Sequence, residues 1–355
     1  MYKISVIMPV YNAEKTLRRA IDSLITQNWK GDFEKDIEIL MVDDNSSDNS
    51  LNIIKELSDK HSNIHYYSFD NNSGFGGRGR NKGISMAEGE YIVLMDNDDI
   101  YLQDALQTFY DAITETGSDI VLANYETDFF THKRLYCPKG YNKNRTLNPT
   151  ESKKMFEIIT HNCSMAPWAK IYRKSFLQEN NIKFVEDSQF DDADFFIKCM
   201  LASTQITILP NNYVYLYNTY DDSQVRIHDK SHFDARVKTM KNIDSMVESK
   251  GFSCKFFTRA NLMELFLIIA NSNESKEDTF SMFEDFREYQ SNLGGLHYSR
   301  PELNFLNKFI MTKHYTISYY ISKFYAVLYN NDLIRKAYRF RNNTSKKFIK
   351  EFYEN

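Results

Sequence analysis

The sequence has little cysteine, and the arrangement of what it has excludes two common roles. Only four of the 355 residues are cysteines, and no two of them stand at the spacing of a metal-binding pair. They are Cys137, Cys163, Cys199 and Cys254. A disulfide framework belongs to an oxidising compartment and usually to a denser set of cysteines. We therefore expect reduced thiols in a cytosolic protein.

Long hydrophobic runs are missing as well. The stretch Leu262–Ala270 is apolar, but it contains Glu264 and is much shorter than the ~20 residues that cross a bilayer. Residues Ile4–Met8 already have the composition of a strand, and no charged-then-apolar export signal precedes them. With 42% hydrophobic and 26% charged residues, the chain is expected to be a soluble, globular protein of the cytoplasm.

Charge is unevenly distributed along the chain. The net charge is −4, but residues 300–355 carry 11 Lys and Arg against 4 Asp and Glu. This last part therefore has a net charge of +7, and the rest of the chain has a net charge of −11. A basic, aromatic tail on an acidic body suggests that the tail meets an anionic partner. The acidic body argues against nucleic acid as that partner.

Strand-like and helix-like segments alternate over the first 125 residues. Strands are expected at 4–8, 37–42, 64–69, 91–95 and 119–123, and helices at 14–27, 49–60, 80–87 and 102–114. This alternation is typical of an α/β fold in which helices flank a mostly parallel, Rossmann-like sheet. Helical patterns dominate later, so we expect an α/β domain over 1–228 and a helical accessory domain over 229–355.

The fourth expected strand ends on acidic residues. Its apolar run, Tyr91–Met95, is followed by Asp96, Asp98 and Asp99. Right-handed crossovers bring the carboxyl ends of parallel strands to one edge of the sheet, where α/β proteins bind ligands. Carboxylates two residues apart on extended backbone point the same way, and a divalent cation holding a phosphate would relieve their repulsion. A solvated acidic turn is the alternative.

A glycine-rich segment follows the third expected strand. Gly74, Gly76 and Gly79 formally match the dinucleotide-binding pattern G-x-G-x-x-G, which leaves a nicotinamide-linked oxidoreductase as one alternative. However, the segment does not follow the first strand, four polar residues precede it, and it carries more positive charge than a pyrophosphate at a helix N-terminus needs. We therefore prefer a flexible glycine loop that delivers Arg80 to a phosphate.

Four segments together resemble one family. In order they read SVIMPVYN from Ser5, VDDNSSD from Val42, RNKG from Arg80 and DNDD from Asp96. Their order and spacing are similar to those of family-2 glycosyltransferases with the GT-A fold, strongly over the first 125 residues and more weakly to about residue 220. Asn45 departs from the family's usual glycine, but asparagine tolerates the left-handed backbone of such a turn.

The resemblance implies an inverting transfer of a hexose or N-acetylhexosamine from a nucleotide diphosphate donor, usually a UDP-sugar. The residues that would bind the donor are Pro9, Tyr11 and Asp43 at its nucleobase, Asn72 and Arg80 at its nucleobase and diphosphate, and Asp96 at its ribose or sugar. Asp98 would bind Mn²⁺ or Mg²⁺, which stabilises the departing diphosphate as a Lewis acid. Further along, the family closes a loop over the diphosphate, which makes Arg226 a phosphate candidate and His228 a metal candidate. A solvated loop is the alternative for both.

Inversion also needs a base that deprotonates the acceptor hydroxyl. The segment Phe190–Phe196 resembles the family's acidic pair with a following aromatic residue, so Asp192 is the expected base and Asp191 the next candidate. An acidic first turn favoured by the helix dipole is the structural alternative. Trp168 lies in a segment similar to the family's acceptor site, where it either stacks on a sugar or belongs to the core.

The acceptor would be a glycan or a lipid-linked hydroxyl in cell-surface polysaccharide synthesis. The basic amphipathic segment 333–355 is expected to associate peripherally with an anionic membrane, at the inner face of the cell membrane. A homo-oligomer interface and a polyanionic acceptor are the alternatives for this segment. For the whole protein, the alternative is a non-catalytic nucleotide- or glycan-binding protein on the same scaffold. The intact set of Asp43, Arg80, Asp96, Asp98 and Asp192 argues against this alternative.

Overall fold

The chain forms two compact units. The computed structural model describes residues 1–129, 132–136, 143–188, 190–218, 229–253, 262, 265–266, 268–292 and 307–330. The first unit takes its described residues from 1–224 and 238–257, and the second takes them from 225–237 and 258–355. The boundary after residue 228 stays a prediction.

The first unit is an α/β fold, as the sequence predicted. Its strands are β1 (Ile4–Val10), β2 (Ile37–Asp43), β3 (Ile64–Ser68), β4 (Tyr91–Leu94), β5 (Ile100–Tyr101), β6 (Ile120–Phe129), β7 (His132–Tyr136), β8 (Arg145–Leu147), β9 (Lys170–Arg173) and β10 (Ile206–Asn218). Its helices are α1 (Leu17–Ile25), α2 (Phe33–Asp36), α3 (Ser50–Lys60), α4 (Gly76–Met86), α5 (Ala105–Thr116), α6 (Lys153–Asn162), α7 (Lys174–Glu179) and α8 (Asp191–Ala202).

All ten described strands belong to one sheet. Its order is β3-β2-β1-β4-β9-β6-β10-β5, with β7 beside β6 and β8 beside β10. The first four strands are parallel, with Ile4 of β1 opposite both Ile37 and Tyr91. β9 runs antiparallel to β4 and to β6, so the sheet is mixed beyond β4. Four residues are too few to give β9 a strand pattern of its own in the sequence.

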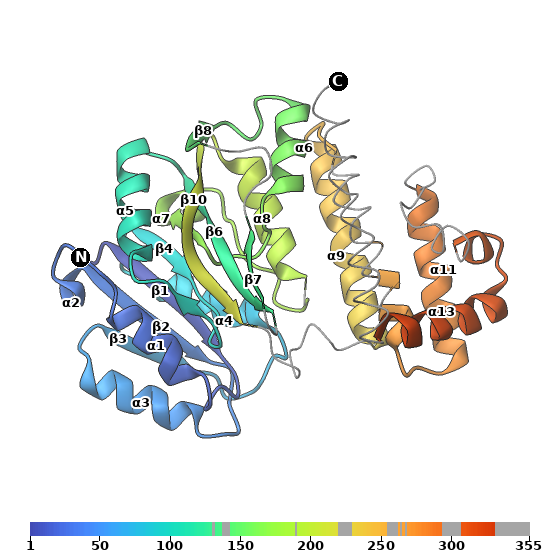
Figure 1. Cartoon of the computed structure of the whole chain (residues 1–355), viewed down its shortest axis with the longest axis horizontal. Helices are drawn as coiled ribbons and strands as arrows, with labels where there is room; N and C mark the ends of the chain where they lie inside the picture. The colour runs from blue at the N-terminus through green and yellow to red at the C-terminus, as the bar shows by residue number, and fades with distance from the viewer. Residues whose placement is uncertain are drawn as a thin grey trace. The chain divides into compact units, whose positions relative to one another are not determined.

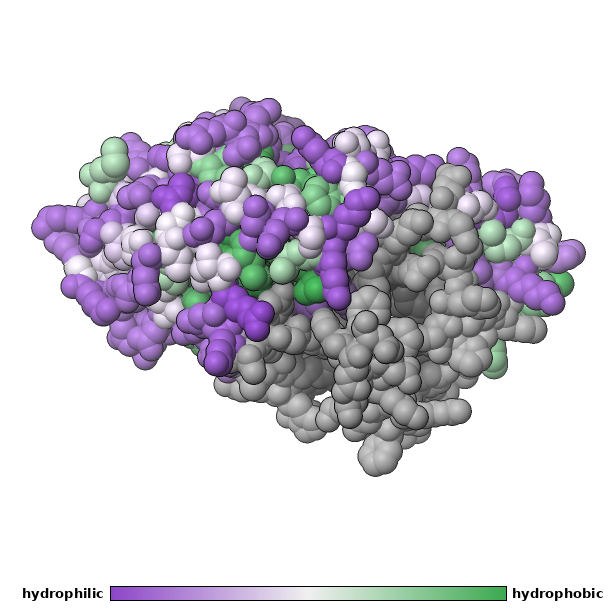
Figure 2. Space-filling model, turned by 90° about the horizontal axis from the view of Figure 1, so that it is seen from above, coloured by the Kyte–Doolittle hydropathy of each residue, from purple (hydrophilic) through white to green (hydrophobic). Residues whose placement is uncertain are grey.

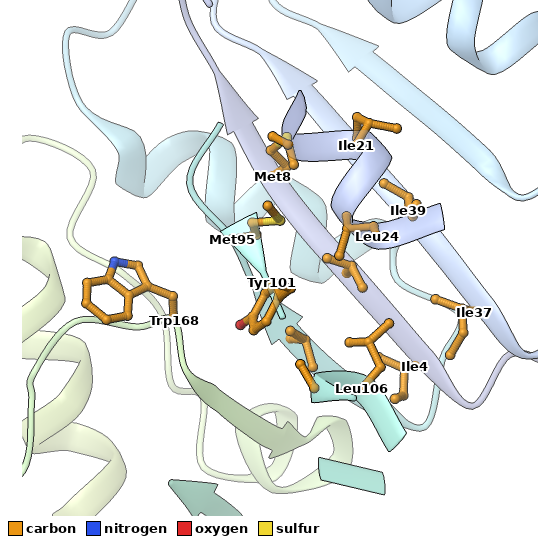
Figure 3. Close-up of a cluster of buried hydrophobic side chains, with 14 of the residues drawn as sticks. Ile4, Met8, Ile21, Leu24, Ile37, Ile39, Met95, Tyr101, Leu106 and Trp168 are labelled. Carbon is orange, nitrogen blue, oxygen red and sulfur yellow. The ribbon is translucent and has the colours of Figure 1, made fainter. Parts of the chain in front are cut away.

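Apolar side chains on the two faces of the sheet build two cores. Along β1, Ile4 and Met8 face one core and Ile7 faces the other, as alternation along a strand requires. The first core lies under α1, α3 and α5, and Figure 3 shows Ile21 and Leu24 of α1 packed against β1 and β2. The second lies under α6 and α8. Figure 1 shows that helices cover both faces of the sheet.

The glycine-rich segment is mostly helical, so the prediction of a flexible glycine loop is wrong. From its second glycine onward it forms the first turns of α4. A Cβ on Gly77 would lie 2.2 Å from the carbonyl oxygen of Val185, and one on Gly83 would lie 2.3 Å from Cγ2 of Ile7. The glycines therefore let α4 pack closely against β1 and against the segment before α8. Arg80 is thus held rigidly on a helix.

The second unit is helical in its described part. It includes the start of α9 (Lys230–Ser249), together with α11 (Lys276–Asn292) and α13 (Tyr315–Asn330). The rings of Phe283 and Tyr315 stack 6.1 Å apart between α11 and α13. Within the described parts of the chain, no helix is both long and apolar enough to span a bilayer. On the face in Figure 2 the described surface is mostly hydrophilic, and apolar side chains form small patches.

Candidate active site

The polar residues that follow β1 and β4 meet at one edge of the sheet. The N–H of Met95 donates to the carbonyl of Ile7 at 3.0 Å. Just beyond β4, the side-chain amide of Asn97 donates to the carbonyl of Pro9, near the end of β1, at 2.9 Å. These bonds hold the two strand ends side by side, at the edge where an open α/β sheet binds ligands.

Tyr11 and Asp43, two of the residues expected to bind the nucleobase, differ in exposure. Tyr11, directly after β1, is 39% exposed, which leaves its ring accessible to a planar group. Asp43 is fully buried, and its carboxylate accepts hydrogen bonds from the Ser46 N–H at 3.2 Å and the Ser68 hydroxyl at 2.8 Å. Asn45 in the same turn has the expected left-handed backbone, with a φ of 62°. Asp43 therefore holds the turn, and its contact with the nucleobase of a donor stays a prediction.

Asp44, the next residue, ties the segment before α4 to the end of β2. Its carboxylate accepts hydrogen bonds from the Ser73 N–H at 2.9 Å and the Asn72 amide at 3.1 Å, and it pairs with Arg78. The Asn72 amide also donates to the carbonyl of Asp44 at 3.0 Å. Asn72 thus fixes its own segment, and its contact with a donor molecule stays a prediction.

The guanidinium of Arg80 joins three carboxylates. Its Nη2 lies 2.9 Å from Oδ1 of Asp96, and its Nη1 lies 3.0 Å from Oδ2 of Asp191 and 3.1 Å from Oδ1 of Asp192. The arginine side chain is 9% exposed, whereas those of Asp96 and Asp192 are 28% and 35% exposed. One buried cation therefore connects the acidic end of β4 to the acidic first turn of α8, and leaves two of its partners accessible to solvent.

Hydrogen bonds hold both sides of this cluster. Asn81, the next residue of α4, accepts the N–H of Phe184 and donates to the carbonyl of Phe184, both at 2.9 Å. These two bonds attach the segment before α8 to α4. On the other side, the hydroxyl of Tyr215 accepts the N–H of Asp96 at 3.1 Å and donates to Asp99 at 2.8 Å. The first turn of α8 and the end of β4 are thereby fixed on either side of the guanidinium.

The acidic pair of α8 has raised pKa values. For Asp192 burial is the largest cause, Arg80 opposes it, and the charges of Asp191 and Asp96 raise the pKa further. Burial also raises the pKa of Asp191, again against Arg80. Three carboxylates around one guanidinium carry excess negative charge, which favours keeping a proton. Asp192 is therefore a stronger base than an ordinary aspartate, and of the pair it is the more accessible residue.

Asp98 and Asp99 have different environments at the end of β4. Asp99 is fully buried, and burial, followed by the charges of Asp96 and Asp98, raises its pKa well above the usual range. Its carboxylate accepts the Tyr215 hydroxyl and the Asn218 N–H, each at 2.8 Å, so it supports the fold. Asp98 is only half-buried. A half-buried carboxylate beside an anionic cluster fits Mn²⁺ or Mg²⁺, which prefer oxygen ligands.

Trp168 is part of the core, one of the two alternatives left by the sequence. It is 6% exposed, and its ring stacks on Tyr215 at 4.6 Å and on Tyr217 at 5.5 Å between centroids. Figure 3 shows Trp168 apart from the aliphatic side chains of the first core, with Tyr101 between them. Stacking on an acceptor sugar would require this covered ring to become exposed.

Two residues near the cluster were not singled out by the sequence. Burial, followed by the charges of four surrounding aspartates, raises the pKa of Tyr217 to about 12. These aspartates are Asp99, Asp96, Asp98 and Asp192. Lys170 of β9 is 2% exposed, and burial lowers its pKa to about 8. Neither residue has a local sequence signal, because only the fold brings it near the carboxylates.

Some candidates lie outside the described residues, namely Arg226, His228 and the segment 333–355. Within the ranges that are described, no three His, Cys, Asp or Glu side chains gather as a ready-made ion site. The metal roles of Asp98 and His228 stay predictions.

Comparison with known proteins identifies a family and relatives of this chain. A family model described as glycosyl transferase family 2 matches residues 5–180. The chain is 28% identical over 345 residues to Glycosyltransferase GlyA of Streptococcus pneumoniae, which covers 94% of this chain and 47% of that protein. It is 32% identical over 218 residues to a poly(ribitol-phosphate) beta-glucosyltransferase of Bacillus spizizenii, which covers 60% of this chain and 32% of the other. The chain thus spans less than half the length of these two relatives.

Solved structures share the fold. The crystal structure of Staphylococcus aureus TarS residues 1–349 in complex with UDP has a TM-score of 0.65 at 22% identity, and the match covers 91% of each chain. A mannosyltransferase of Pyrobaculum calidifontis in complex with GDP-Man and Mn²⁺ has a TM-score of 0.51 at 13% identity, covering 93% of this chain and 88% of the other. These likenesses confirm the GT-A fold expected from the sequence.

Proposed function

Residues 5–180 of this chain belong to glycosyltransferase family 2, and from this membership we propose that the protein transfers a sugar, with inversion, from a nucleotide diphosphate donor to an acceptor hydroxyl. The observation that supports this most is the cluster around Arg80. Its guanidinium links Asp96, on the proposed donor side, to Asp192, the proposed base. Both acids remain partly exposed, as groups that meet substrates must be.

The donor is proposed to lie along the ends of β1, β2 and β4. The residues proposed to bind it are Pro9, Tyr11, Asp43, Asn72, Arg80, Asp96 and, outside the described residues, Arg226. The exposed ring of Tyr11 suits stacking on a nucleobase. TarS, which shares the fold, has been crystallised with UDP and with UDP-GlcNAc. The exposed ring fits a nucleotide donor in general, and the TarS complexes favour a UDP-sugar among them.

Asp192 is proposed to act as the base. It takes the proton of the acceptor hydroxyl while that oxygen bonds to the anomeric carbon, on the face opposite the diphosphate. The bond between the anomeric carbon and the diphosphate oxygen breaks, and its electron pair leaves with the diphosphate. The raised pKa of Asp192 and its partial exposure suit proton transfer. Asp191, which is more deeply buried, would orient Arg80.

Asp98 is the proposed protein ligand of Mn²⁺ or Mg²⁺, and His228 is a second candidate. A bound ion would offset the negative charge of the departing diphosphate as a Lewis acid. Asp98 suits this role because it is half-buried and so partly accessible, whereas Asp99 is fully buried.

The acceptor is proposed to be a glycan or lipid-linked molecule of cell-surface polysaccharide synthesis. Several relatives are named for the transfer of glucose or N-acetylglucosamine to poly(ribitol-phosphate), including TarP of Staphylococcus aureus, which is 28% identical over 228 residues. These names favour a hexosyl or N-acetylhexosaminyl transfer to a polymer of this class.

A panel of nucleotide sugars tests the proposed activity. The whole chain is incubated with UDP-, GDP- and dTDP-sugars, in Mn²⁺ or in EDTA, and slow donor hydrolysis is measured because it requires no known acceptor. We expect UDP-sugars to be consumed in Mn²⁺ and spared in EDTA. Donor binding without consumption would instead support a nucleotide- or glycan-binding protein without transfer activity. Binding of a nicotinamide cofactor alone would contradict the proposal.

The segment 333–355 is proposed to hold the protein at the inner face of the cell membrane. Its support is the net charge of +7 over residues 300–355, together with its aromatic and aliphatic residues. Deleting 333–355 is expected to reduce sedimentation with anionic liposomes while UDP binding is retained. Unchanged sedimentation would favour a homo-oligomer interface or a polyanionic acceptor as the role of this segment.

A further inference from the structure

Lys170 is a buried cation to which the proposed reaction assigns no role. It is the first residue of β9 and is 2% exposed. Its Nζ donates to the carbonyl oxygens of Ala166 at 2.5 Å and of Trp168 at 3.4 Å, and the ring of Phe196 lies 5.5 Å away. Burial removes the hydration of an ammonium group, and these partners compensate for the loss.

The two carbonyls belong to a strained stretch of backbone, Ala166–Ala169, here called the clasped segment. Ala169 has a φ of 53°, a left-handed conformation that residues other than Gly, Asn and Asp seldom adopt. Such a conformation persists only where its surroundings impose it. The hydroxyl of Tyr172 donates to the carbonyl of Pro167 at 3.0 Å. Three consecutive carbonyls therefore accept hydrogen bonds from buried side chains, two of them from Lys170.

The clasped segment reaches the proposed active site through aromatic rings. Trp168 stacks on Tyr215 and Tyr217. The Tyr215 hydroxyl binds the N–H of Asp96, and the charge of Asp192 contributes to the raised pKa of Tyr217. A shift of the clasped segment would therefore move the Tyr215 ring, which binds the proposed donor residue Asp96, and the Tyr217 ring, which feels the charge of the proposed base Asp192.

We propose that Lys170 is a positioning residue for sugar transfer, which holds the carbonyls of Ala166 and Trp168. It thereby fixes the stacked rings of Trp168, Tyr215 and Tyr217, here called the aromatic wall, of which Tyr215 binds the N–H of Asp96. This inference rests on the proposed function, because the transfer reaction is what requires that wall to be fixed. A loosely held wall would misplace the reacting groups, and displacements of about 1 Å can cost two orders of magnitude in rate.

The hold of Lys170 on the segment is expected to weaken in mildly alkaline solution. Burial lowers the pKa of Lys170 to about 8, and the nearby Cys163, Asp192 and Cys199 oppose that effect. Cys163 follows α6, and the other two lie on α8. Cys199 stays a thiol because burial raises its own pKa. The charged amine is therefore present at neutral pH and is lost as the pH rises through about 8.

Trp168 itself reports on the clasped segment. The chain has two tryptophans, so Trp29→Phe leaves Trp168 as the single one. In this background we expect the emission of Trp168 to change as the pH rises through about 8, and Lys170→Met to abolish that transition. Lys174→Met is the matched control, since Lys174 also donates to a backbone carbonyl, that of Ala87 at 3.1 Å.

A kinetic measurement separates positioning from stability. Lys170→Met is expected to lower kcat by about tenfold to a hundredfold with little change in the KM for the donor. It should also remove the fall in rate at alkaline pH, while the Lys174 variant behaves as wild type. Lys170→Gln, which keeps a donor group, is the second variant and is expected to restore part of kcat.

The outcomes distinguish this inference from the proposed function. Suppose that the wild type consumes a nucleotide sugar, and that the Lys170 and Lys174 variants show equal kcat and equal Trp168 emission. Then the inference about Lys170 is contradicted, while the proposed function stands. If the wild type consumes none, the proposed function is overturned. The titration of Trp168 emission in the Trp29→Phe background, with and without Lys170→Met, then decides whether Lys170 holds the clasped segment, since it needs no activity; a transition that is absent, or that persists in Lys170→Met, would contradict the inference.

Discussion

Replacing Asp192 by asparagine is expected to leave donor binding almost unchanged and to lower the rate of sugar transfer by about 10²- to 10⁴-fold. Asparagine has nearly the same shape, but its amide cannot take the proton of the attacking hydroxyl. Asp192 meets Arg80 through one oxygen at 3.1 Å and is 35% exposed, so the amide is expected to occupy the same position. UDP affinity by calorimetry and donor turnover, measured on one preparation, separate the two effects.

Asp194→Asn is the matched control for this substitution. Asp194 also lies in the first turn of α8 and is buried, but its carboxylate pairs with Lys198 at 2.5 Å. Its variant is expected to keep wild-type turnover. If the Asp192 variant also keeps it, Asp192 is not the base, and Asp191→Asn becomes the next substitution to measure.

The same assignment gives the direction of the pH dependence. A base works only when it is deprotonated, and burial raises the pKa of Asp192 above the usual aspartate value of about 3.9. Activity is therefore expected to fall on acidification at a higher pH than an ordinary aspartate would allow.

Replacing Asp98 by asparagine is expected to abolish the part of UDP binding that depends on Mn²⁺. A neutral amide is a weaker ligand for a hard cation than a carboxylate. The backbone carbonyl of Asp98 accepts hydrogen bonds from Arg19 at 2.8 Å and from Asn218 at 2.9 Å, and both bonds survive a change of side chain. The loss can therefore be assigned to the ion and not to a disturbed turn.

Calorimetry with UDP is the measurement for Asp98, and wild type in EDTA is its reference. The variant in Mn²⁺ should bind UDP as weakly as that reference does. Wild-type affinity in the variant would remove Asp98 from the proposed ion site and leave the metal dependence itself without a ligand among the described residues.

The strand ends could be predicted from the sequence, and the contacts between them could not. A strand buried on both faces leaves a continuous apolar run, so the acids after Leu94 had to lie at the edge of the sheet. The carboxylates that meet Arg80 come from positions 16, 111 and 112 residues away, and nothing local pairs them. The sequence therefore predicted the members of the cluster separately, and the fold supplied the cation that joins them.

The errors have similarly physical reasons. Glycine is a poor helix former, so a glycine-rich run before Arg80 was interpreted as a loop. Close packing of α4 against Ile7 and Val185 outweighs that preference, because no Cβ could fit there. Lys170 went unnoticed because a lysine in a strand gives no sign of burial until the neighbouring helices are in place.

Proton NMR of the donor-hydrolysis reaction tests the central claim most directly, namely that an acceptor oxygen, here that of water, attacks the anomeric carbon on the face opposite the diphosphate while Asp192 takes its proton. The UDP-sugar consumed in the panel is followed from the first minutes, before the released sugar equilibrates between its anomers. From an α-linked donor the account predicts that the β-anomer appears first, and that the Asp192→Asn variant releases almost no sugar. Initial release of the α-anomer, or wild-type release by that variant, would contradict it.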